Sequence, residues 1–119
     1  MLRRMYWVKY HLRYLRILRE AVKAVARAVQ DLDPLAEVYI VGGAAEDRLT
    51  VLSDVDVLVI TSRTLDSKSL NEFRRAIYAR AVDIYNLPWD YPLEIHIMSR
   101  EEFKETFANR RKKAVKIEA

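Results

Sequence analysis

Two aspartates at the start of an apolar run are the residues of this sequence whose type and spacing best suit chemistry. The run from Val55 to Ile60 is short and rich in β-branched side chains, which is typical of a buried strand. Asp54 stands just before it and Asp56 inside it, and side chains two residues apart on a strand share a face, roughly 6.5–7 Å apart. Carboxylates that close raise each other's pKa unless a cation lies between them. The pair therefore indicates a site for divalent ions that bridge carboxylate and phosphate oxygens.

A glycine pair, Gly42 and Gly43, precedes the aspartates in the sequence. Only glycine lets a backbone approach a phosphate closely and take φ > 0 in the turn. The N–H groups of the pair are expected to bind phosphate, and Ser53 could add a hydrogen bond to it. The alternative is structural, with the glycines forming a tight turn after a strand and Ser53 ending the loop.

These features together resemble the nucleotidyltransferase superfamily typified by DNA polymerase β, and within it the minimal nucleotidyltransferases. The family pattern is an apolar residue, Gly, Gly or Ser, a spacer, Asp-x-Asp in an apolar strand, and a third acidic residue on a later strand. The matching segments here are Val41-Gly42-Gly43, Asp54-Val55-Asp56 and Leu93-Glu94-Ile95-His96-Ile97, with Glu94 as the third carboxylate. The resemblance covers roughly residues 38–97 and implies the polymerase β-like fold.

The resemblance implies nucleotidyl transfer by two metal ions. Asp54 and Asp56 would bind the Mg²⁺ ion that holds ATP or another nucleoside triphosphate, with Mn²⁺ as an alternative ion. With Glu94 they would bind a second ion that lowers the pKa of an attacking hydroxyl, and Glu94 could also act as general base. The hydroxyl would displace pyrophosphate from the α-phosphorus, a transfer catalysed by positioning and charge neutralisation. The group transferred is expected to be AMP.

Three residues near the glycine pair depart from the family pattern. Relatives usually carry Ser where Gly43 stands, so a hydroxyl contact to phosphate is lost. Most also carry a basic residue and then Gly where this chain has Glu46-Asp47, two acids that would repel a triphosphate unless they point away. Arg48 could compensate for this repulsion by binding the nucleotide. A catalytically silent module that acts only by binding is therefore an alternative.

Basic residues are concentrated at the two ends of the chain. The net charge is +4, and the basic residues gather in residues 1–30 and in the cluster Arg110-Arg111-Lys112-Lys113. This asymmetry suggests an acidic partner surface or RNA, with solvated basic ends as the simpler interpretation. The resemblance implies a separate acceptor protein, because related domains are paired with a small helical HEPN protein. In such pairs the nucleotidyltransferase is the antitoxin and acts by adenylylating the toxin or by contact alone. Self-association is left open.

The segments that must position these residues alternate between helical and strand patterns. The expected elements, in order, are a helix over about residues 3–31, strands over 37–41 and 54–61, a helix over 69–85, a strand over 93–98, and a C-terminal helix within 99–119 that fades into a basic tail. Capping-box sequences begin at Ser69 and Ser99. The order α-β-β-α-β-α predicts an α/β (α+β) fold, a small mixed sheet with helices packed on it.

The strand expected over 93–98 alternates in a way that assigns its faces. Leu93, Ile95 and Ile97 share one face, while Glu94 and His96 share the other. His96 could therefore act beside the metals, although a hydrogen-bonded histidine at the sheet edge is the simpler interpretation.

The bulk composition bounds the class of protein. At 119 residues and 51% hydrophobic content, residues 1–119 are expected to form one domain with its catalytic-type core over about 37–98. The absence of cysteine excludes disulfides and thiolate metal sites. The chain lacks both an apolar run long enough to cross a bilayer and a signal core, so no membrane association and a cytoplasmic location are expected. A charged fraction of 32%, with few Asn and Gln, indicates a thermophilic source.

Overall fold

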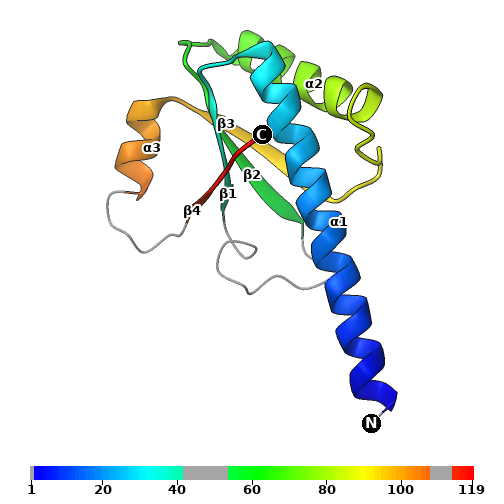
Figure 1. Ribbon diagram of the computed structural model, residues 1–119. Coiled ribbons are helices and arrows are strands. Elements are labelled where there is room, and N and C mark those ends of the chain that lie inside the picture. The colour runs from blue at the N-terminus through cyan, green and yellow to red at the C-terminus, as the bar shows by residue number, and fades with distance from the viewer. Residues whose placement is uncertain (1, 42–53, 108–113) are drawn as a thin grey trace.

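A computed structural model describes residues 2–41, 54–107 and 114–119 of the chain, with side chains described from residue 13 onward except that of residue 107. These ranges contain three helices and four strands (Figure 1). They are, in chain order, α1 (Leu2–Leu32), β1 (Glu37–Val41), β2 (Val55–Ile60), α2 (Ser67–Asp83), β3 (Leu93–Met98), α3 (Arg100–Phe107) and β4 (Ala114–Ile117).

The four strands form one mixed sheet in the order β3-β2-β1-β4. β2 and β3 are parallel, because the chain returns through α2 between them, whereas β1 is antiparallel to both β2 and β4. The mixed α/β class expected from the sequence is confirmed. β1 and β3 have the expected bounds, and β2 is one residue shorter than expected at each end.

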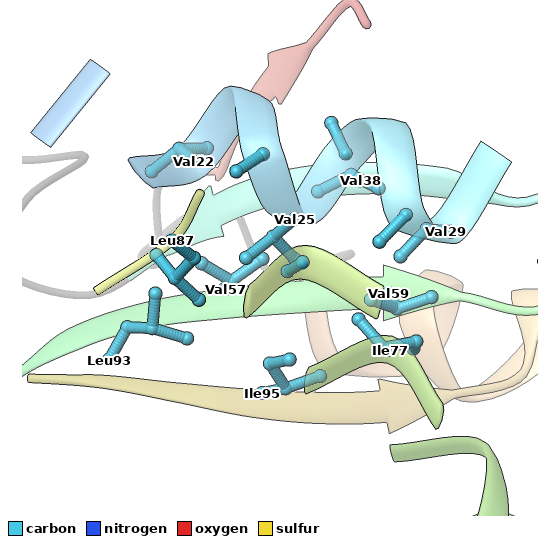
Figure 2. Packing of buried hydrophobic residues seen from close by; sticks show 14 of the residues in the cluster. Val22, Val25, Val29, Val38, Val57, Val59, Ile77, Leu87, Leu93 and Ile95 are labelled. Carbon is cyan, nitrogen blue, oxygen red and sulfur yellow. The ribbon is translucent and has the colours of Figure 1, made fainter. Parts of the chain in front are cut away.

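The core lies between α1, α2 and one face of the sheet. Val22, Val25 and Val29, which recur at intervals of three and four residues and form an apolar stripe on α1, are at most 1% exposed. Figure 2 shows them pointing toward Val57 and Val59 of β2, which are fully buried. Because the hydrophobic face of the sheet is closed by two helices, strand positions on the opposite face are left for other roles.

The stripe on α1 is buried only along part of the helix. Leu15, which the same spacing places on the stripe nearer the N-terminus, is 41% exposed, and Ile17 is 42% exposed. The N-terminal half of α1 extends beyond the sheet (Figure 1). Neither α1 nor any other helix in the described ranges has the length and hydropathy needed to cross a bilayer.

The second face of the sheet carries α3. Leu58 and Ile60 are each 1% exposed but lie outside the cluster under α1 and α2, so they belong to this face. Tyr39, which pairs with Leu58 across β1 and β2, packs its ring on that of Phe103 of α3, with the centroids 4.9 Å apart. The helix therefore covers the part of this face nearest Tyr39.

The two expected capping boxes have different outcomes. At Ser99 the N-cap half of the box is confirmed, since the Glu102 N–H donates to the Ser99 hydroxyl at 3.1 Å, and that hydroxyl donates to a Glu102 carboxylate oxygen at 3.3 Å. At Ser69 the expected box is wrong. Asp66 is the N-cap of α2, and its carboxylate accepts from the Ser69 N–H at 2.8 Å. An aspartate is an equally strong cap and its charge suits the helix N-terminus, so the helix begins earlier.

Strand β4 is a difference from the sequence analysis, which expected a basic tail after the last helix. Ala114 to Ile117 instead pair with β1 at the edge of the sheet, with Val41 opposite Ala114 and Val38 opposite Ile117. Four residues after a run of basic residues carry too little alternation to predict a strand.

Asp33 fastens the C-terminal end of α1 to the end of β2. It is 4% exposed, and its carboxylate accepts from the hydroxyls of Thr61 and Ser62 at 3.2 and 2.7 Å and from the backbone N–H groups of Ser62 and Leu35 at 3.1 and 3.3 Å. Burial alone would raise the pKa of Asp33, but these hydrogen bonds outweigh it and hold that pKa below its usual value.

Asp33→Asn is expected to lower the free energy of unfolding at pH 7 by about 1–3 kcal/mol, because an amide nitrogen would face the donors that the carboxylate now satisfies. Since the folded-state pKa is lowered, the contribution of the carboxylate is present above the unfolded pKa of about 3.9 and is lost as the pH falls through the lower folded value. Urea unfolding should therefore show the difference at pH 7 and a smaller one below about pH 4.

The matched control is Asp83→Asn at the exposed end of α2, which should change stability by no more than about 0.5 kcal/mol. An Asp33→Asn protein as stable as the wild type at pH 7 would show that the carboxylate does not hold these two elements together.

Candidate functional site

The parallel register of β2 and β3 places two carboxylates side by side. Asp56 of β2 is aligned with Glu94 of β3, and Leu58 with His96. Aligned residues on neighbouring strands project from the same face, about 4.8 Å apart along the hydrogen-bonding direction. Both carboxylates therefore emerge on the face that carries α3, away from the core.

His96 completes the group. Its Nε2 lies 3.1 Å from Oδ1 of Asp56 and 4.0 Å from Oε2 of Glu94. One donor atom from each of the three residues lies within 4.8 Å of the others. The side chains are open to solvent, at 36% for Asp56, 43% for His96 and 62% for Glu94. The face assignment made from the alternation of β3 is confirmed, and the histidine is hydrogen bonded on an edge strand as the simpler interpretation expected.

The fold has little need of these three polar groups. Like charges aligned on neighbouring strands destabilise a sheet, and a solvent-exposed histidine–aspartate pair contributes only about 0–1 kcal/mol. The burial on this face is provided instead by Leu58 and Ile60. The group of Asp56, Glu94 and His96 is therefore better explained by binding than by stability.

The donor set fits a divalent cation. Carboxylate oxygens are the ligands that Mg²⁺ and Mn²⁺ prefer, and a neutral imidazole nitrogen also binds transition ions. Adjacent ligands of an octahedral ion with bonds of about 2.1 Å are roughly 3 Å apart. The separation between Nε2 of His96 and Oδ1 of Asp56, 3.1 Å, is of that size.

Asp54 lies at the same end of β2 but outside this group. It is exposed and comes directly before Val55, whose N–H donates to the Pro92 carbonyl at 2.9 Å. Among the described side chains, the close group contains Asp56, Glu94 and His96 and not Asp54. The metal-binding role expected for Asp54 stays a prediction.

The expected phosphate-binding residues Gly42, Gly43, Arg48 and Ser53, and the departures Glu46 and Asp47, lie outside the described residues. Val41, which precedes the glycine pair in sequence, is aligned with Asp56 across β1 and β2. The chain therefore leaves β1 beside the candidate site, and the nucleotide-binding role of the glycines stays a prediction.

The direct contact between His96 and Asp56 is the feature that sequence reasoning did not specify. The alternation of β3 assigned His96 to the Glu94 face, but its reach to Asp56 depends on the register between β2 and β3. That register joins segments far apart in the chain and has no local sequence signal.

Comparison with protein families agrees with the resemblance found in the motifs. Residues 22–119 match the family model of the nucleotidyltransferase domain, a span that includes the whole candidate site. No curated protein sequence matches the chain. Among solved structures, the chain is similar to a crystal structure provisionally assigned as a nucleotidyltransferase, with 21% identity, 91% of this chain and 98% of that chain covered, and a TM-score of 0.45.

Proposed function

Because the chain belongs to the nucleotidyltransferase domain family, we propose that it transfers AMP from ATP to a hydroxyl group of a separate protein or RNA acceptor. The observation that carries this proposal is the alignment of Asp56 with Glu94 on parallel strands, inside the region that matches the family. Two exposed carboxylates in that position have a chemical use when a cation and a polyphosphate meet there.

The chain's own residues have distinct roles in this proposal. Asp56 and Glu94 would hold Mg²⁺, or Mn²⁺, with Asp54 beside them, and the bound ion would neutralise phosphate charge and lower the pKa of the attacking hydroxyl. Glu94 is the most exposed of the three grouped side chains and lies on edge strand β3, so it is accessible to an acceptor and could take the proton of its hydroxyl. The acceptor oxygen bonds to the α-phosphorus and pyrophosphate leaves.

The phosphate contacts in this proposal come from the segment after β1. Gly42 and Gly43 would offer backbone N–H groups to the triphosphate, with Ser53 and Arg48 as further donors. The alignment of Val41 with Asp56 supports this arrangement, because β1 ends at Val41 next to a carboxylate of the site.

The proposed acceptor is a helical protein partner of HEPN type, which this chain would neutralise as an antitoxin. A groove of about 410 Å³ between α1 and the β1–β4 edge supports a docking surface there. Leu15 and Leu18 are among its apolar lining residues. Arg19 and Lys23 add positive charge to the lining, whereas Lys116 lies 3.9 Å from Glu118, which lines the groove as well. A partner with an acidic, partly apolar surface would complement this groove.

The proposal is tested by calorimetric titration of the protein with ATP in the presence of Mg²⁺ and again in EDTA. ATP is expected to bind at least about tenfold more weakly without the ion, because the triphosphate would then face Asp56 and Glu94 without charge neutralisation. Equal binding in the two conditions would contradict a carboxylate-held ion at the nucleotide site. No ATP binding in either condition would contradict a nucleotide site in the free chain.

A further inference from the structure

We propose that Nε2 of His96 is a third ligand of the ion held by Asp56 and Glu94, and that it makes the site prefer Mn²⁺ to Mg²⁺. The inference rests on the proposed function, since it concerns the ion of the same site. It adds a nitrogen ligand to a set that the sequence motif describes as carboxylates alone, and it names His96 as the residue that determines which ion the site selects.

The geometry of His96 is the first argument. Its Nε2 lies 3.1 Å from a carboxylate oxygen of Asp56 and 4.0 Å from one of Glu94, so the nitrogen faces both oxygens at once. Ligands of one octahedral ion are separated by roughly 3 Å when adjacent and by roughly 4 Å when opposite. An ion shared by the two carboxylates would therefore meet this nitrogen without a change of strand register.

The chemistry of the ring is the second argument. Mg²⁺ prefers oxygen ligands and keeps several of its waters, whereas transition ions bind imidazole readily. Two carboxylates alone would attract both ions mainly through charge. Adding one imidazole favours Mn²⁺ selectively, because only the transition ion gains from exchanging a water for nitrogen.

The bond between His96 and Asp56 adds a tautomer requirement. A hydrogen bond from Nε2 to the carboxylate needs the proton on Nε2, whereas a metal bond needs the lone pair there and the proton on Nδ1. Ion binding would therefore replace the hydrogen bond to Asp56 and move the ring proton. Because Mn²⁺ is paramagnetic, its binding at Nε2 is detected as broadening of the ring resonances of His96, a readout that is independent of any measurement of activity.

The variant His96→Gln separates this role from a structural one. Glutamine can still hydrogen bond to Asp56 but has no imidazole nitrogen. The position is 43% exposed on an edge strand, so the substitution leaves the buried side chains of the sheet unchanged. The matched control is His11→Gln, because His11 is the second of the two histidines in the chain and lies in the part of α1 that extends beyond the sheet (Figure 1).

The test is titration of the full chain with Mn²⁺ and, separately, with Mg²⁺, followed by calorimetry and, for Mn²⁺, by electron paramagnetic resonance. The wild type and His11→Gln are expected to bind Mn²⁺ at least about tenfold more tightly than Mg²⁺. His96→Gln is expected to lose about tenfold or more in Mn²⁺ affinity and less than about threefold in Mg²⁺ affinity. In the wild type, Mn²⁺ should broaden the ring resonances of His96 before those of His11.

The outcomes distinguish this inference from the proposed function. If His96→Gln keeps the wild-type preference for Mn²⁺ while Asp56→Asn loses both ions, the ligand role of His96 is overturned and the carboxylate site stands. If His96→Gln loses the preference for Mn²⁺ but the wild type shows no nucleotidyl transfer, the ligand role of His96 stands and the proposed function is overturned. If the wild type binds neither ion, with or without ATP, both are overturned.

Discussion

Asp56→Asn is expected to reduce nucleotidyl transfer by about 10²–10³-fold while leaving the fold intact. The substitution removes the negative charge of Asp56, which lies beside Glu94 across β2 and β3. The site then loses electrostatic stabilisation of a bound cation and, through that cation, of the phosphates. Stability should change little, because the Asp56 side chain is 36% exposed and its bond to His96 is a surface interaction. The measurement is transfer of label from α-labelled ATP to acceptor, together with thermal unfolding of both proteins.

The control for this loss is Asp83→Asn, which removes one carboxylate at the exposed end of α2 and should transfer at the wild-type rate. Wild-type transfer by Asp56→Asn would show that this carboxylate takes no part in the reaction. A third result would identify the alternative function. If neither the wild type nor Asp56→Asn transfers label but both neutralise the partner equally, the chain is a silent antitoxin that acts by contact alone.

The strands of this fold were predictable where local pattern and burial agree. β3 has the expected bounds because Leu93 and Ile95 face the core while Glu94 and His96 face away, a strict alternation with few competing interpretations. β2 was predictable because it is an almost continuous apolar run that does not alternate. It is an apolar run flanked by a strand on each side, and all of its residues except Asp56 are buried.

Elements whose stability comes from distant partners were harder to predict. β4 exists because β1 offers it an unpaired edge, and this partner lies far away in the sequence. The start of α2 depended on a choice between two good caps, Asp66 and Ser69, that propensity alone ranks as equal. The hydrogen bonds of Asp33 had no sequence signature either. Asp33 follows α1, whereas its donors Thr61 and Ser62 follow β2, far away in the sequence.

The candidate site was likewise predictable in its local features but not in its contacts between strands. The residue types of Asp56 and Glu94 and the faces on which they lie could be derived from the motif and from strand alternation. Their alignment as direct neighbours could not, since it depends on the parallel register of two strands joined through α2. For the same reason His96 could be assigned to the correct face but not to a contact with Asp56.

Ile77→Ala is expected to cause the largest loss of stability, about 2–5 kcal/mol. Ile77 is fully buried on α2, and Figure 2 shows its side chain beside Val59 of β2. Truncation removes favourable burial and leaves a cavity between α2 and the sheet, which close-packed neighbours can fill only in part. Urea unfolding measures the loss directly, and the midpoint of thermal unfolding should fall by roughly 10–20 °C.

Ile84→Ala makes the same chemical change at the C-cap of α2, at a position that is 55% exposed, and should cost less than about 1 kcal/mol. Comparable losses in the two variants would mean that α2 is not packed on the sheet as described.

Because α2 connects β2 to β3 and covers them, it also supports the register that aligns Asp56 with Glu94. Ile77→Ala should therefore keep its ion and nucleotide binding at low temperature and lose both together as it unfolds, whereas Asp56→Asn should lose them at every temperature without unfolding.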